Sequence, residues 1–140
     1  MGNYWSSSKV TRTYGWKPDS QREGDLYHQF NICNNQYTIK KVDLRNYCPQ
    51  VYDQGHLGSC TANAISAAYE IDQIKQKEED PFVPSRLFIY YNEREIEGHT
   101  GEDSGAEIKD GIKSIHNVGV CPESMWKYDI NKFTEKPPEE

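Results

Sequence analysis

Apolar positions along the second half of the chain predict three helices, and the first of them follows Ser59. Small and branched residues recur there at the i, i+3, i+4 and i+7 spacing of one helical face: Ala64, Ala67, Ala68, Ile71 and Ile74. The charged run 75–80 and then Pro81 end this helix. Because these residues are small, we expect close packing on both sides of the helix and a central place for it in the fold.

A second helix is predicted between Pro84 and Gly98. Ser85 is a good N-cap residue, and Gly98 suits the left-handed position that ends many helices. Four residues supply its apolar side: Leu87, Phe88, Tyr91 and Ile96.

The third helix has the clearest start signal. Ser104 and Glu107 have the spacing of a capping box, in which the two side chains satisfy the first backbone N–H groups of a helix. An apolar face then repeats before Gly119 closes the helix: Ile108, Ile112 and Ile115.

Strand signals are weak, so the pattern indicates a mainly helical domain with an extension at each end. Residues 1–41 are polar, with Trp16 expected to be the buried anchor of a loop and 36–42 alternating like a short strand. Residues 131–140 have the composition of a linker. The predicted domain is therefore 42–130.

Composition narrows the functional classes. The 140 residues suit one domain with a modest core, and 35% hydrophobic content is low for a self-sufficient globule. The net charge of −6 argues against a nucleic-acid partner, which would need a basic surface. The chain has no apolar stretch of membrane-spanning length and no signal-peptide core, so we expect an intracellular, cytoplasmic protein.

One membrane signal remains at the N-terminus. The first six residues fit the loose N-myristoylation pattern at Gly2, but the bulky Tyr4 and Trp5 do not strengthen it. A single acyl chain would bind a membrane only marginally. We therefore expect no membrane partner.

The four cysteines raise the question of chemistry: Cys33, Cys48, Cys60 and Cys121. None are spaced as C-x-x-C, which argues against a structural zinc site, and the chain has no Gly-rich phosphate loop. We expect neither a metal nor another cofactor.

Cys60 differs from the other cysteines because it stands at the predicted start of the central helix. A helix N-terminus favours an anion, and the thiolate is the nucleophilic form of cysteine. The backbone N–H of Cys60 and the side-chain amide of Gln54, six residues earlier, can both donate to an oxyanion. A cysteine near a helix start is nevertheless most often a packing residue, so spacing alone leaves both interpretations open.

Sequence motifs point to one family. Residues 53–60 resemble the active-site motif of the papain family of cysteine peptidases, with the same step from Gln54 to Cys60. Residues 42–45 resemble the start of the mature domain, and 119–128 resemble the segment that closes its left-hand lobe. Further stretches resemble the bacterial and large-DNA-virus branch: 84–92 and 103–106.

This resemblance implies an α+β fold of papain type. The chain would supply the mainly helical left-hand lobe, with three helices and little sheet, and the right-hand β lobe would be absent from it. The implied catalytic residues are the nucleophile Cys60 and the oxyanion donor Gln54. The implied substrate-binding residues are Gly58 and Ser59 along the cleft, Ser104, Gly105 and Ala106 against the substrate backbone, and Ile108 near the pocket for the residue two before the cut.

Two positions depart from the family pattern without abolishing chemistry. Leu57 stands where many members have a disulfide-forming cysteine, so that bridge should be absent, and Thr61 replaces the usual Trp.

A third departure concerns the base. The family's His and Asn lie more than about a hundred residues after the cysteine, but only 80 residues follow Cys60. The chain's own histidines are each expected to be solvated rather than catalytic: His28, His56, His99 and His116.

Two functions therefore remain open. The chain is the nucleophile-bearing half of a cysteine peptidase that acts on peptides or proteins and needs a His- and Asn-bearing lobe or partner chain. Alternatively, it is a non-catalytic binding or structural module, such as a virion component. Residues 1–41 also have two open roles, either as a propeptide-like segment over the cleft or as packing on the back of the lobe.

Overall fold

The computed structural model describes residues 13–25 and 41–138, and it contains three α-helices with a small two-stranded sheet. In chain order the elements are β1 (Trp16–Lys17), η1 (Arg45–Tyr47), α1 (Cys60–Gln76), α2 (Arg86–Glu97), β2 (Ala106–Glu107), α3 (Ile108–Val118) and η2 (Ile130–Lys132). This arrangement matches the predicted lobe of three helices and little sheet.

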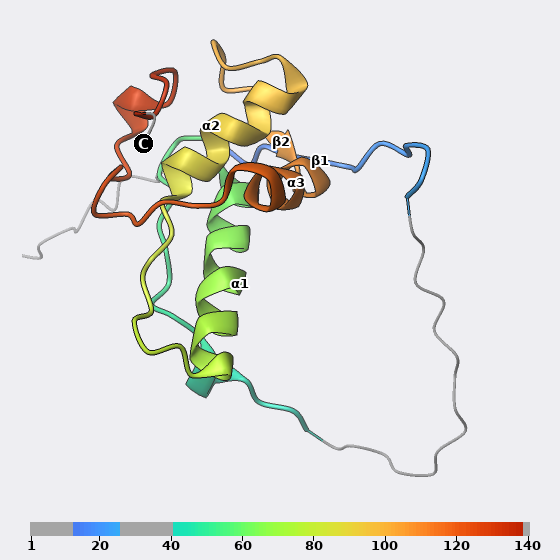
Figure 1. The fold of residues 1–140 in the computed structure, drawn as a ribbon. Coiled ribbons are helices and arrows are strands. Elements are labelled where there is room, and N and C mark those ends of the chain that lie inside the picture. Colours follow the sequence, from blue (N-terminus) through green and yellow to red (C-terminus); the bar gives the residue numbers. More distant parts are fainter. Residues whose placement is uncertain (1–12, 26–40, 139–140) are drawn as a thin grey trace, which may run out of the picture.

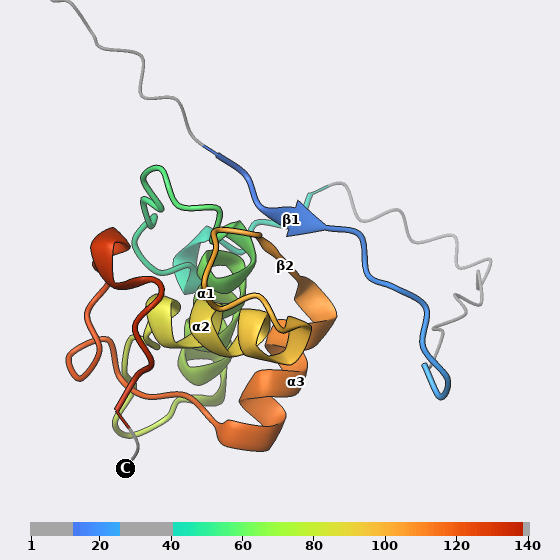
Figure 2. The same ribbon diagram turned by 90° about the horizontal axis from the view of Figure 1, so that it is seen from above.

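The three helices pack against one another around the N-terminal half of α1. α2 crosses near the N-terminal end of α1, and α3 contacts both of them (Figures 1 and 2). α1 begins at Cys60, as predicted, and ends where Lys77 adopts the left-handed conformation with φ 58° and ψ 45°.

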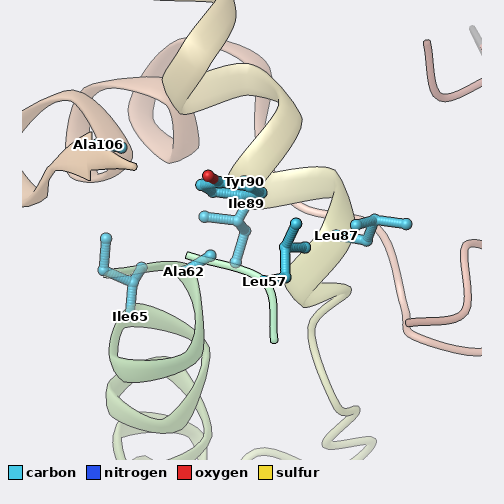
Figure 3. Close-up of a cluster of buried hydrophobic side chains, with 7 residues drawn as sticks. All are labelled: Leu57, Ala62, Ile65, Leu87, Ile89, Tyr90 and Ala106. Atoms are coloured by element: carbon cyan, nitrogen blue, oxygen red, sulfur yellow. The ribbon is translucent and has the colours of Figure 1, made fainter. Parts of the chain in front are cut away.

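The core lies where α1, α2 and the two flanking loops meet (Figure 3). Its buried members are Leu57, Ala62, Ile65, Leu87, Ile89, Tyr90 and Ala106. Leu57 precedes the nucleophile and Ala106 belongs to the predicted substrate-binding segment. The same cluster therefore holds both sides of the candidate site.

The predicted packing on both sides of α1 is wrong for the described residues. Ala64 and Ala68 are exposed and Ile74 is half exposed, while the buried positions lie on another face: Thr61, Ala62, Ile65, Ser66 and Gln73. The reason is that α2 and α3 contact that other face. Periodicity shows that a helix is amphipathic, but tertiary contacts decide which face is covered.

Both end signals of α2 are confirmed. The Ser85 Oγ accepts a hydrogen bond from the Phe88 N–H at 3.1 Å, and Gly98 has φ 77°. Leu87 and Tyr91 are buried as the predicted apolar side requires, whereas Ile96 is exposed.

The predicted capping box of α3 is wrong. The helix begins at Ile108 after a short strand, and its N-cap is Glu107. Ser104 instead bonds locally to the carbonyl of Gly105, while the Glu107 carboxylate accepts hydrogen bonds from Ser20. The isoleucine face of α3 is largely outward, with Ile112 59% exposed, and the buried residues are Asp110, Gly111 and Ser114.

The only sheet among the described residues joins the N-terminal extension to the domain. β1 pairs with β2 in parallel, with Trp16 opposite Ala106 and Lys17 opposite Glu107. Trp16 is 56% exposed, so its predicted burial is wrong. Most of the weak strand signal at 36–42 lies outside the described residues, as does Gly2.

Candidate active site

Cys60 is the first residue of α1, which places its thiol at the positive end of a 17-residue helix. The helix starts here because the Ser59 carbonyl accepts the first intrahelical hydrogen bond, from the Asn63 N–H at 3.0 Å. Cys60 is half-buried. To the described residues its thiol makes no hydrogen bond and no ion pair.

Tyr128 forms hydrogen bonds to two residues of the loop before Cys60. Its hydroxyl donates its one proton to the carbonyl of Gln54 at 2.9 Å. In the 2.6 Å contact with Ser59 Oγ, Tyr128 is therefore the acceptor and Ser59 is the donor. Burial raises the pKa of Tyr128, which keeps it a neutral donor. One side chain therefore holds both the predicted oxyanion donor and the residue that precedes the nucleophile.

The Gln54 side chain already binds peptide carbonyls. Its Nε2 donates to the carbonyl of Leu57 at 3.0 Å and to the carbonyl of Thr13 at 2.9 Å. The first bond orients the amide within its own loop. The second bond reaches a segment 41 residues earlier in the chain.

Residues 104–106 form the facing wall of the site. Gly105 and Ala106 are buried, and Gly105 has φ 68°, a conformation that suits glycine. The Ala106 N–H donates to the carbonyl of Gly15 at 2.9 Å. Ile108 stands just beyond this wall and is partly exposed, at the first position of α3.

Residues 13–17, called the strap below, pass between these two walls. A Cβ atom added at Gly15 would lie 2.0 Å from the Gly58 oxygen and 2.6 Å from the Gly105 Cα. The gap between Gly58 and Gly105 therefore has room for a peptide backbone but not for a side chain at position 15. Figures 1 and 2 show β1 beside β2 near the N-terminal end of α1.

Charged side chains hold the strap and the residues after it. Lys17 pairs with Glu97 at 2.5 Å. Arg22 binds the buried Asp110 through two bonds of 2.5 and 2.7 Å, and Lys109 pairs with Asp25 at 2.8 Å. Hydrogen bonding from Lys109 lowers the pKa of Asp25. These contacts dock residues 16–25 on α2 and the start of α3.

A hydrogen-bonded bridge connects the two walls. The Gly58 N–H donates to both carboxylate oxygens of Asp103 at 3.0 Å, and the Tyr90 hydroxyl donates to Asp103 at 2.5 Å. The Gly105 N–H in turn donates to the Tyr90 oxygen at 3.1 Å. Gly58 and Gly105, 47 residues apart in sequence, are thus linked through two side chains.

Glu93 is a buried carboxyl beneath the start of α1. Its Oε2 accepts from Thr61, the residue after Cys60, at 2.8 Å, while its Oε1 has no hydrogen-bond partner among the described residues. Desolvation by burial raises the pKa of Glu93 to about 8, and the nearby carboxylates of Glu97 and Asp110 act in the same direction. Glu93 is therefore largely protonated at neutral pH.

Comparisons with known proteins agree on one relationship. No protein-family model matches the chain. It is 60% identical over 107 residues to an uncharacterised peptidase C1-like protein of Acanthamoeba polyphaga mimivirus, and the match covers 76% of this chain and 34% of that protein. Its structure matches the crystal structure of xylellain, a cysteine protease from Xylella fastidiosa, with a TM-score of 0.71 and 39% identity over 92% of this chain.

The chain is thus similar to papain-like cysteine peptidases in sequence and in fold. It carries the helical left-hand lobe of that fold, and the described residues contain no right-hand β lobe. The chain spans about a third of the mimivirus relative and about half of xylellain. The resemblance to the bacterial and large-virus branch is thereby confirmed.

Within this papain-like lobe, the predicted site residues fall into two groups. Gln54, Gly58, Ser59 and Cys60 belong to one wall, residues 54–60. Ser104, Gly105 and Ala106 form the other wall, with Ile108 just beyond it, and the strap passes between Gly58 and Gly105. Their catalytic and binding roles stay predictions. Among the described residues, no three His, Cys, Asp or Glu side chains are grouped as a metal site requires.

The described histidines are all exposed, and the expectation that none of them is catalytic stays a prediction. His99 pairs with Glu102 at 2.9 Å, and His116 is exposed on α3. His56 is exposed in the loop before Cys60, and His28 lies outside the described residues.

Sequence reasoning missed three residues that shape the papain-like site: Tyr90, Asp103 and Tyr128. Tyr128 lies in the motif that resembles the end of the lobe, so its position was a usable signal. Tyr90 and Asp103 also lie in stretches that resemble the bacterial and large-virus branch, 84–92 and 103–106, but no local pattern signals their contacts, because each acts on a wall that is distant along the chain.

No helix among residues 13–25 and 41–138 is both long and apolar enough to cross a lipid bilayer.

Proposed function

We propose that this chain is the nucleophile-bearing half of a cysteine-type peptidase, with peptides or proteins as substrates. One observation carries the proposal. The Gln54 amide donates to the backbone carbonyl of Thr13, in a peptide segment that passes between Gly58 and Gly105. This is the kind of bond that an oxyanion donor makes to a substrate carbonyl.

The chemistry follows from the position of Cys60. Its thiolate would attack the scissile carbonyl carbon, so that a C–S bond forms while the carbonyl oxygen becomes an oxyanion. The Cys60 N–H and the Gln54 amide would stabilise that oxyanion. The C–N bond then breaks, the amine leaves with a proton from a general acid, and water hydrolyses the thioester.

The general acid and base must come from outside the described residues. In this proposal a right-hand lobe with His and Asn supplies them, either in a longer gene product or as a second chain. An intracellular location remains part of the proposal.

The strap is proposed to be propeptide-like. It fills the gap between the walls and uses the Gln54 amide, so a substrate backbone would have to displace it. A substrate bound against Ala106 would also need the N–H that now donates to Gly15. Residues 13–25 would then hold the site closed until the strap leaves.

A labelling experiment tests the nucleophile. The chain would be treated with an epoxide-type thiol inhibitor, with and without a right-hand lobe, and the modified cysteine located by mass spectrometry. We expect selective labelling of Cys60 over Cys48 and Cys121, faster with the added lobe, and loss of labelling in Cys60→Ala.

The alternative function gives the opposite result. A non-catalytic module would show no preference for Cys60 and no peptidase activity when the right-hand lobe is present. Equal labelling of all cysteines in the assembled protein would therefore favour the binding or structural role.

A further inference from the structure

Asp103 and Tyr90 form a bridge whose hydrogen-bond directions are dictated by chemistry. The Gly105 N–H can only donate, so the Tyr90 oxygen accepts it and the single Tyr90 proton goes to Asp103. The Gly58 N–H also donates to Asp103. The residue at 103 must therefore accept two hydrogen bonds and donate none, which an ionised carboxylate does and an amide does poorly.

Burial makes the bridge hard for water to replace. Tyr90 is 0% exposed, and both Gly58 and Gly105 are buried, although Asp103 itself lies at the surface. A buried N–H or O–H group that loses its hydrogen-bond partner destabilises the folded state, because no water replaces the bond. The inner side of the bridge is therefore fixed even where the carboxylate meets solvent.

Arg94 supports the bridge from behind. Its guanidinium, which is fully buried, donates to the carbonyls of Thr100 and Glu102 at 3.0 and 2.9 Å and lies 4.1 Å from the centre of the Tyr90 ring. It therefore holds both the loop that leads into Asp103 and the ring that contacts Asp103.

We propose that Asp103, held by Tyr90, is a positioning residue that sets the spacing between the two walls of the cleft. The gap matches a single backbone, because even one Cβ at Gly15 would collide with both Gly58 and Gly105. Leu57 removes the disulfide expected in this loop, and the next residue, Gly58, is fastened by Asp103 instead. The inference rests on the proposed peptidase function, since the walls matter only if substrate passes between them.

The two side chains should have separable effects on catalysis. Tyr90→Phe removes the acceptor for Gly105 and the hydroxyl bond to Asp103, but it leaves the bond from Gly58 to Asp103, so it loosens the substrate-backbone wall more than the wall at Gly58. Asp103→Asn disturbs both walls, including the loop that leads into Cys60. Misplacement by about 1 Å can lower a rate about 100-fold.

Kinetics of the peptidase assembled with its right-hand lobe test whether the two substitutions have these different effects. We expect Tyr90→Phe to raise KM about tenfold with little change in kcat, and Asp103→Asn to lower kcat/KM about 100-fold through both parameters. Tyr91→Phe is the matched control, because Tyr91 is also buried on α2 and its hydroxyl makes no hydrogen bond to a described residue. The control should behave as the unsubstituted chain.

Amide hydrogen exchange of the 140-residue chain gives a readout that needs no activity. Tyr90→Phe should speed exchange at Gly105, and Asp103→Asn should speed it at Gly58, each by about tenfold or more, while Tyr91→Phe changes neither. Thermal unfolding of each variant shows whether it is folded, and the near-isosteric Tyr90→Phe decides the matter if Asp103→Asn does not fold.

The outcomes separate the two ideas. If exchange changes as expected but even the unsubstituted assembled protein cleaves no peptide, the proposed function fails and the bridge stands as a structural link. If the assembled protein is active and folded Tyr90→Phe and Asp103→Asn keep its KM and kcat, the positioning role is overturned. Unchanged exchange in both folded variants overturns the bridge itself.

Discussion

At the residue scale, the candidate site combines the half-buried Cys60 with a buried, neutral acid that contacts the next residue of α1. Glu93 bonds to Thr61 on α1, and a Cβ at Gly111 on α3 would lie 2.3 Å from the Glu93 Oε1. The glycine therefore lets α3 approach the carboxyl closely. A charge placed there would have no cationic side chain bonded to it, which is why burial favours the protonated form.

Glu93 should make the stability of the lobe depend on pH. Its pKa is about 8 when folded and near the ordinary 4.5 when unfolded, so the folded state binds more protons between these values. The free energy of unfolding should thus fall as pH rises through this window, by at most about 1.4 kcal/mol per pH unit, and level off above it.

Denaturant unfolding of the chain and of Glu93→Gln between about pH 5 and pH 9 measures this effect. The neutral glutamine side chain should reduce the fall of the unfolding free energy with rising pH. Glu95→Gln, an exposed change on the same helix, should leave that fall unchanged. Equal slopes in the chain and in Glu93→Gln would show that another group causes the pH dependence.

At the element scale, the strap is the segment whose removal should change the site most. Gly15 is the point of closest approach, because a Cβ added there would lie 2.0 Å from a backbone atom of one wall and 2.6 Å from a backbone atom of the other. Gly15→Ala should therefore expel the strap without disturbing the three helices. We expect faster alkylation of Cys60 by iodoacetamide and, in the assembled peptidase, higher activity.

Gly101→Ala is the control for this change, because a Cβ there meets nothing within 4 Å. High salt should act in the same direction as Gly15→Ala, since added ions screen the partly exposed ion pairs of residues 17–25. Unchanged Cys60 alkylation in folded Gly15→Ala would contradict the propeptide-like role and favour simple packing of the extension.

At the scale of the whole molecule, the stretch 42–51 exposes several large apolar side chains. Val51 is 93% exposed, and other large apolar residues in the same stretch are exposed as well: Val42, Leu44 and Tyr47. η1 in this stretch contacts α1, whose Ala64 and Ala68 are also exposed. An apolar surface of this kind is typical of an interaction site.

We expect this surface to bind the right-hand lobe of the proposed peptidase. The part of the mimivirus relative outside the matched region is a suitable partner, and calorimetric titration measures the affinity. Val51→Asp should weaken binding by about tenfold or more while leaving the thermal unfolding of the separate chain unchanged. Asp72→Asn, an exposed change on α1, serves as the control, and equal affinities for both variants would place the partner elsewhere.

Much of the fold and the nucleophile wall could be predicted from local sequence. Ser85 and Gly98 mark the two ends of α2, and Cys60 is the first residue of α1. Such helix ends could be predicted because capping depends on residues within one turn. The family motif also located Gln54. The prediction for the start of α3 was wrong, since the Glu107 side chain bonds to Ser20 rather than capping the helix.

Only the tertiary structure decided how these parts meet. The inward face of α1, the strap between Gly58 and Gly105, and the Asp103–Tyr90 bridge all depend on pairs far apart in sequence. Local propensity carries no information about such pairs, because their free energy comes from burial and from hydrogen bonds made only in the folded chain. The sequence by itself determined that Cys60 begins the central helix, and the tertiary structure decided what surrounds it.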